Sequence, residues 1–248
     1  MRAFWDQYAG GANFGDALTR VLLSRIAGIE PEWAEVPDAH LVAVGSVLEA
    51  VPDGWAGTVL GSGLMFDESR RDLTCSRVLA LRGRLTLERV RLSPENPPPV
   101  LADPGLLAGL LLHERPRPDV DVGFIRHYVD HRGNPGDYKV RSIEVDPGRR
   151  ETVLEIDVLA GVDQVVTAAA RCRRIVSSSL HGIILADSLG IENWWDPHPG
   201  VLGDGFKFRD YASSFGETIR PGWRLADQAQ VRAKQEALLE ILRAFREV

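Results

Sequence analysis

Short apolar runs of strand length alternate with segments that have helical spacing. The strand-like runs of the first half are MRAFW, HLVAVGSVL, GTVLGSGL, RVLALRG and PPVLAD. A helix is predicted at 15–28, because its apolar residues recur three or four positions apart. We expect Asp16 to cap this helix and Gly28 to end it. Such alternation is typical of parallel βαβ units.

The same alternation returns after a proline-rich, charged segment at 113–121, which is the best candidate for a linker. Another helix, PGLLAGLLL, precedes this segment, with Asp103 as its expected N-cap. The last segment, from Asp227 onward, has the stripe of an amphipathic helix and a cap at its start. The pattern predicts two Rossmann-like halves, 1–115 and 116–248, with the C-terminal helix packing back on them. Such halves place a ligand at the carboxyl ends of their strands.

The net charge, the cysteines and the length of the apolar runs argue against several classes of protein. The net charge of −6 argues against a dedicated nucleic-acid binder, which would normally be basic. Cys75 and Cys172 lie far apart in no metal-binding spacing, and MRAFWDQYAGG lacks the apolar core of a signal peptide. We therefore expect a cytoplasmic protein with free thiols. Since the apolar runs are too short to span a bilayer, any membrane association is expected to be peripheral.

The stretch SSSLHGIILADSLGI, at 177–191, places hydroxyl groups and a histidine where a strand turns into a helix. Ser178, Ser179 and His181 would lie at the positive end of that helix, where hydroxyls and free N–H groups suit an anion. The helix dipole would lower the pKa of the histidine and a bound anion would raise it again. A histidine held between these effects can act as a general acid or base. The alternative is a serine cap beside a packed histidine.

Other polar residues follow predicted strands and would reach the same cleft. NFGDALT begins the first helix with Asn13, Gly15 and Asp16, where N–H groups attract anions and a glycine permits close approach. Arg82 ends a strand and could form a fork with a carboxylate or phosphate, with Thr86 four residues on. A tight turn at the first motif and a surface arginine at the second are the simpler alternatives.

Two further motifs add basic side chains. GFIRHYVD carries Arg126 and His127 where the first strand of the second half should end, and FKFRDY carries Lys207 between aromatic residues. Solvated surface positions are again the alternative. His127 with Asp130 and His131 is not favoured as a metal site, because no fourth ligand stands at a convincing spacing. GxGxxG and GxxxxGK motifs are absent from the sequence, so nicotinamide and ATP binding by those routes are not indicated.

Taken together, these motifs resemble the polysaccharide pyruvyl transferase family. The resemblance runs almost end to end, through NFGDALT, VGSVLE, GSGL, LRGRLT, ADPGLL, GFIRHYVD, SSSLHGIILADSLGI and FKFRDY. It implies a fold similar to the two-domain GT-B glycosyltransferases. It also implies transfer of a pyruvyl group from phosphoenolpyruvate to a sugar or lipid-linked glycan. The product would be a cyclic ketal and phosphate would be released, with neither a metal nor a further cofactor.

The resemblance also points to donor contacts. In some members an arginine precedes Leu-His-Gly, and the Arg-Leu-His run contacts the donor; here that run is Ser179, Leu180 and His181. We therefore expect another cation to hold the negative charge of the donor. The candidates are Arg82, Arg126 and Lys207.

The transfer needs a general acid, a base, and groups that hold two anions. We expect His181 to be the acid or to position the phosphate, and Asp16 or His127 to be the base. Two alternatives share the fold: a GT-B-like glycosyltransferase that uses a nucleotide sugar, and a non-catalytic glycan-binding protein. The serine at 179 is the feature that keeps the second alternative open.

Overall fold

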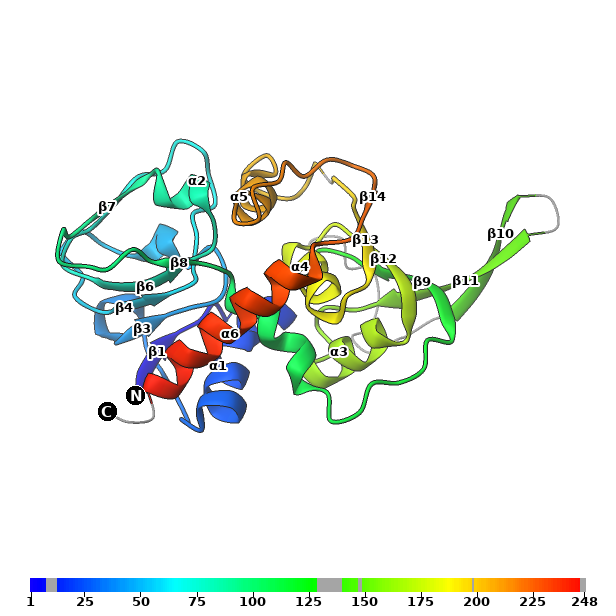
Figure 1. Cartoon of the computed structure of the whole chain (residues 1–248), viewed down its shortest axis with the longest axis horizontal. Helices are drawn as coiled ribbons and strands as arrows, with labels where there is room; N and C mark the ends of the chain where they lie inside the picture. Colours follow the sequence, from blue (N-terminus) through cyan, green and yellow to red (C-terminus); the bar gives the residue numbers. More distant parts are fainter. Residues whose placement is uncertain (8–12, 129–139, 147–148, 198, 246–248) are drawn as a thin grey trace.

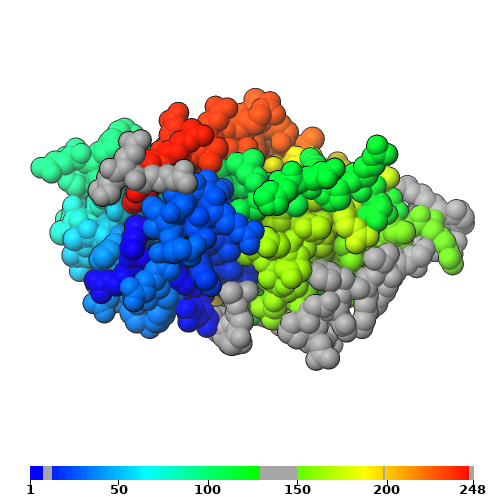
Figure 2. Space-filling model, turned by 90° about the horizontal axis from the view of Figure 1, so that it is seen from below, coloured from blue at the N-terminus to red at the C-terminus, as the bar shows by residue number. Residues whose placement is uncertain are grey.

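The computed structural model describes residues 1–7, 13–128, 140–146, 149–197 and 199–245 of the chain. Two six-stranded sheets lie at opposite ends of the molecule (Figure 1). In the space-filling view, the blue and cyan residues of the first half lie beside the green and yellow residues of the second (Figure 2). The first sheet has the order β2-β1-β3-β4-β6-β8, and all its strand pairs are parallel. Its strands are β1 (Arg2–Phe4), β2 (Glu32–Trp33), β3 (Leu41–Val42), β4 (Thr58–Leu60), β6 (Arg77–Leu81) and β8 (Val100–Leu101).

The second sheet has the order β10-β11-β9-β12-β13-β14. Its central pairs are parallel and its two edge pairs are antiparallel. Figure 1 shows β10 and β11 extending away from the body of the molecule. The strands are β9 (Val120–Ile125), β10 (Val140–Asp146), β11 (Arg149–Ile156), β12 (Cys172–Ser177), β13 (Glu192–Trp195) and β14 (Trp223–Arg224). The protein is therefore α/β with mainly parallel sheets, as the alternating pattern predicts.

Shorter elements complete the first half. A parallel pair, β5 (Arg71–Leu73) with β7 (Val90–Leu92), forms a small separate sheet. The remaining pieces are η3 (Val36–Asp38), η4 (Val47–Ala50) and α2 (Arg84–Leu87).

The first helix, α1 (Phe14–Leu22), continues into a π-helical turn, η2 (Leu23–Ala27). Gly28 ends this helix with a φ of 68°, which confirms the predicted stop. The prediction that Asp16 caps the helix is wrong. Asn13 is the N-cap residue, and Asp16 lies in the first turn. Asp16 is thereby free of a capping role.

The segment η5 (Pro104–Leu111) lies at the centre of the helices and is a 3-10 helix. Asp103 caps it as predicted, by accepting a hydrogen bond from the Gly105 N–H at 2.8 Å. η5 packs against α1, α3 (Val162–Ala170), α4 (Leu180–Leu189) and α6 (Gln228–Ala244). Buried residues of these helices and of both sheets form one hydrophobic core. The two sheets are thus joined by packed side chains.

Two helices connect the halves a second time (Figure 1). α6 contacts η2 and β8 of the first half as well as α4 of the second, and Asp227 caps it as predicted. The FKFRDY motif begins α5 (Phe206–Ser213), which packs against α2 of the first half. Of the predicted linker at 113–121, residues 113–119 contain neither helix nor strand, whereas the last two belong to β9. In the described part of the chain, no helix has both the length and the apolar character needed to cross a membrane.

Candidate active site

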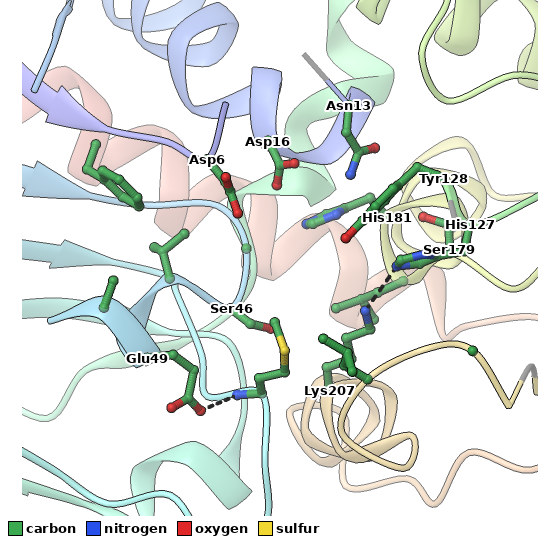
Figure 3. Close-up of a pocket in the computed structure, with 18 residues that line it drawn as sticks. Asp6, Asn13, Asp16, Ser46, Glu49, His127, Tyr128, Ser179, His181 and Lys207 are labelled. Carbon is green, nitrogen blue, oxygen red and sulfur yellow. Dashed lines mark hydrogen bonds between the residues drawn. The ribbon is translucent and has the colours of Figure 1, made fainter. Parts of the chain in front are cut away.

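A cavity of about 460 Å³ lies between the two halves, at the carboxyl ends of strands from both sheets. Open α/β sheets place their ligands at this edge. Figure 3 shows side chains from the two halves facing one another across it. The lining residues from the first half are Phe4, Asp6, Asn13, Asp16, Gly45, Ser46, Val47, Glu49, Ala50 and Met65. Those from the second half are His127, Tyr128, Ser179, Leu180, His181, Gly200, Leu202 and Lys207.

Seven of the predicted site residues line this cavity: Asn13, Asp16, His127, Ser179, Leu180, His181 and Lys207. Gly15 borders it, because a β-carbon at that position would lie 1.9 Å from Nδ1 of His181. The first turn of α1 can approach the histidine ring this closely only because residue 15 has no side chain. The remaining predicted residues, Arg82, Thr86, Arg126 and Ser178, do not line it.

The amino end of α4 forms one wall. Ser179 is the N-cap residue, and its side chain makes no capping hydrogen bond. Ser177, just behind it, is fully buried; its hydroxyl is 2.8 Å from the carbonyl of Ile125 and accepts from the Ser179 N–H at 3.0 Å. The serine run thus fixes the start of α4, and the positive end of the helix faces the cavity.

His181 lies in the first turn of α4 and is 9% exposed. Burial, followed by the nearby charges of Lys207 and Arg82, lowers the pKa of its imidazole to about 3. The ring is therefore neutral at pH 7 in the ligand-free protein. Its Nε2 atom is buried and has no hydrogen-bond partner among the described residues.

Asp16 faces His181 from α1 (Figure 3). Burial, followed by the like charge of Asp6, raises the pKa of its carboxyl group to about 7. A hydrogen bond with Asn13 and the charge of Lys207 oppose this rise. A carboxyl group with such a pKa can both give and take a proton near neutrality.

Lys207 extends from α5 toward the same space, with its Nζ 3.4 Å from Nε2 of His127. Burial, and then the charge of Arg82, lowers the pKa of the lysine to about 8. The ammonium group still carries most of its charge at pH 7. The backbone N–H of His127 is held by the Ser178 hydroxyl at 2.9 Å, so Ser178 supports the site from behind.

Arg82 and Thr86 belong to a buried network beside the cavity. The Nε of Arg82 donates to Asp210 on α5 at 2.8 Å, and both side chains are fully buried. Thr86 donates to the same carboxylate through its N–H and its hydroxyl, each at 2.7 Å. Arg82 also donates to Ser46, a lining residue, at 2.8 Å. The guanidinium is thus used to join the two halves.

Arg126 is exposed and lies over the ring of Phe124, 5.2 Å from its centroid. Of the three predicted cations, Lys207 is the one that lines the cavity. Asp130 and His131 lie outside the described residues. Among the described residues, no group of three or more His, Cys, Asp or Glu side chains is arranged to hold a metal ion.

Sequence reasoning missed four polar lining residues: Asp6, Ser46, Glu49 and Tyr128. Asp6 stands two positions beyond the first strand, and this place at the carboxyl end of a strand is the signal that could have found it. Glu49 has a structural task, because its carboxylate accepts from the Met65 N–H at 2.8 Å and pairs with Arg71 at 3.0 Å. Asp6 is the missed residue with a direct effect on the site, since it raises the pKa of Asp16.

The amino-acid sequence is similar to those of two curated proteins. It is 34% identical over 186 residues to an uncharacterized protein of Acanthamoeba polyphaga mimivirus, covering 71% of this chain and 60% of that one. It is 27% identical over 232 residues to the succinoglycan biosynthesis protein ExoV of Rhizobium meliloti, covering 88% of this chain and 66% of that one. The chain thus spans less than two thirds of the length of either relative. No solved structure matches it significantly.

The family model for polysaccharide pyruvyl transferase matches residues 67–195, slightly more than half of the chain. The matched range contains α4 with its serines and His181, as well as His127. The chain belongs to the polysaccharide pyruvyl transferase family.

Proposed function

We propose that the protein transfers a pyruvyl group from phosphoenolpyruvate to a sugar of a polysaccharide or glycan precursor, forming a cyclic ketal and releasing phosphate. One observation carries the proposal. A helix amino end and a buried lysine face a carboxyl group whose pKa is about 7 across a single cavity. Such a cavity can hold an anionic donor and move a proton at the same time. Membership of the polysaccharide pyruvyl transferase family supports a pyruvyl transfer, and the relative ExoV is a succinoglycan biosynthesis protein, which fits a polysaccharide product.

Phosphoenolpyruvate carries a carboxylate and a phosphate, and we assign both to the α4 side of the cavity. The free N–H groups at the start of α4, the Ser179 hydroxyl and the Lys207 ammonium supply the donors. Lys207 takes the place of the arginine that some members carry at the position of Ser179. His127, 3.4 Å from the ammonium, lies within reach of the same anion.

Asp16 is assigned the first proton transfer, because its pKa of about 7 keeps a substantial protonated fraction at neutral pH, whereas His181 is neutral. The Asp16 proton passes to the methylene carbon, which becomes the ketal methyl group. A sugar hydroxyl attacks the neighbouring carbon, and its proton returns to the Asp16 carboxylate. Phosphate then leaves, and the second sugar hydroxyl attacks the same carbon to close the ketal. This hydroxyl gives its proton to neutral His181, which passes the proton on to phosphate or solvent.

The proposed reaction also concerns the domain arrangement and the cellular location of the protein. Two Rossmann-like domains, divided at 115/116 in the GT-B manner, would bring donor and acceptor together in the cavity; the two sheets support this division. We place the reaction in the cytoplasm, with membrane contact only through a lipid-linked acceptor. No metal or further cofactor is part of the proposed chemistry.

The test is an assay of the purified protein with phosphoenolpyruvate and a panel of lipid-linked and polymeric glycans. Phosphate release and the ketal methyl signal in the proton NMR spectrum should appear together and depend on the acceptor. Lys207→Met should raise KM for phosphoenolpyruvate, and Asp16→Asn should lower kcat by about 10²–10⁴-fold. Arg209→Met is the matched control, because Arg209 stands on the same helix and donates to the carbonyl of Asp204 at 2.5 Å.

Nucleotide release from a sugar nucleotide, without phosphate release from phosphoenolpyruvate, would instead identify a glycosyltransferase. If phosphoenolpyruvate gives neither turnover nor a thermal shift across the panel, while a glycan does give a shift, the protein is a non-catalytic glycan binder. Either result overturns the proposal.

A further inference from the structure

In the part of the chain that the structure describes, two buried polar atoms without hydrogen-bond partners belong to side chains that both approach Gly105 of η5. Among the described residues, the buried side-chain atoms that lack a hydrogen bond are Oδ2 of Asp103, Nε2 of His181 and Oγ of Ser214. The first two side chains meet at Gly105. A β-carbon there would lie 3.0 Å from Oδ1 of Asp103 and 3.5 Å from Cδ2 of His181, the ring carbon bonded to Nε2. A buried polar atom without a partner destabilises the folded state, so two of them on side chains that approach the same residue call for a common explanation.

The cap of η5 needs only one oxygen of Asp103. Oδ1 accepts from the Gly105 N–H at 2.8 Å, whereas Oδ2 has no hydrogen-bond partner within the described ranges of the chain. The side chain is completely buried, and burial raises the pKa of its carboxyl group to about 6. The charge of Arg82 opposes that rise. An uncharged cap, such as serine or asparagine, would serve the helix equally well without burying a carboxyl group.

The imidazole of His181 has two different sides. Nδ1 lies against the first turn of α1 at Gly15, on the side of Asp16 (Figure 3). Nε2 lies on the buried side, with η5 beyond it. A neutral imidazole carries its proton on one nitrogen and a lone pair on the other. The group that meets Nε2 therefore decides what Nδ1 can do.

We propose that Asp103 is a positioning residue for His181: Oδ2 accepts a hydrogen bond from the Nε2–H through one bridging water molecule. This bond fixes the tautomer whose lone pair is on Nδ1 and faces the cavity. The inference rests on the proposed function, in which neutral His181 accepts the proton of the second sugar hydroxyl. That proton moves to Nδ1, Nε2 keeps its own, and the Asp103 carboxylate stabilises the imidazolium.

Asp103→Asn separates positioning from capping. The amide oxygen can still cap Gly105, but the amide nitrogen would donate toward Nε2 and favour the opposite tautomer. We expect kcat to fall by about 10²-fold or more while KM for phosphoenolpyruvate stays within a factor of about two. Asp227→Asn is the matched control, because Asp227 caps α6 in the same way, at 2.8 Å from the Ala229 N–H, and is exposed. It should retain full activity.

Nitrogen NMR of protein labelled at histidine gives a readout that needs no turnover. The His181 signals, assigned by their loss in His181→Asn, should show the Nε2–H tautomer in the unmodified protein and the Nδ1–H tautomer in Asp103→Asn. Should the unmodified protein show Nδ1–H, the proposal is overturned, whether or not Asp103→Asn folds. Unchanged kcat in a folded Asp103→Asn would overturn it equally. If no acceptor is ever turned over, the proposed function fails and the NMR result still decides the role of Asp103.

Discussion

At the scale of single residues, burial sets the protonation states on which the cavity depends. Asp16 and His181 face each other, and burial is the largest cause of the shift in both pKa values. The same effect raises the pKa of the acid and lowers that of the base, because it disfavours whichever form is charged. Both groups are therefore predominantly uncharged somewhat below pH 7, and an anionic donor meets little repulsion from Asp16 there.

Asp16→Asn should make the protein more stable at pH 8. A carboxyl group whose pKa rises from 3.8 to about 7 on folding favours the folded state fully below pH 3.8, and this contribution is lost as pH rises through 7. The asparagine variant has no such loss. We expect it to gain about 1–3 kcal/mol in unfolding free energy at pH 8 and almost nothing at pH 4, since one pKa unit is worth about 1.4 kcal/mol.

Urea unfolding at both pH values measures this difference, with Asp53→Asn at an exposed position as the control. A gain of equal size at pH 4 and pH 8 would show that ionisation of Asp16 is not its cause.

The residue types of the site could be predicted from the sequence, because a polar residue just beyond a buried strand reaches the carboxyl edge of a parallel sheet. His127 is identified in this way, and Asn13, Asp16 and His181 by their places at the starts of helices; all four line the cavity. Which cation enters it could not be predicted, because Lys207 reaches it from a helix whose position depends on contacts with the other half.

At the scale of elements, local chemistry predicted three helix ends correctly and one, the cap of α1, wrongly. Asp103, Asp227 and Gly28 act within a few residues of themselves, and each has its predicted role. The ion pair between Arg82 and Asp210 joins residues 128 positions apart, so no local pattern reveals it. The 3-10 geometry of η5 was equally hidden, because neighbouring helices enclose it on several sides.

Asp210→Ala should be strongly destabilising, because it removes the carboxylate from a fully buried arginine. Loss of one partner of a buried pair typically costs about 3–5 kcal/mol. Arg82→Met combined with Asp210→Leu should cost less than the sum of the two single changes, since it leaves no buried charge unpaired. Unfolding free energies from urea titration test both expectations.

The exposed pair of Arg171 with Asp119, at 2.7 Å, provides the control. Asp119→Ala should change stability by less than about 1 kcal/mol, because solvent screens an exposed pair. Equal losses at the two pairs would contradict the structural role assigned to Arg82.

At the scale of the whole molecule, the alternation of strands and helices predicted α/β architecture and a separate sheet for each half. It did not predict how the halves meet. The core that includes Ala3 of β1 also includes Ile175 of β12, through α1, η5, α4 and α6. Because amphipathic helices show only that one face is buried, the sequence pattern cannot say which partner covers that face.

Leu106 is placed to test whether this shared core makes the two halves unfold together. Its side chain is fully buried in η5, and its carbonyl accepts from Ser188 of α4 at 2.6 Å and from Gln235 of α6 at 2.8 Å. Leu106→Ala should lower the unfolding free energy by about 2–5 kcal/mol. Amide hydrogen exchange should report the same loss at Val59 in the first sheet and at Ile175 in the second, because one cooperative unit has one unfolding free energy. A loss confined to one sheet, or two separate calorimetric transitions in the unmodified protein, would show that the halves are independent and that the cavity walls can move apart without unfolding either one.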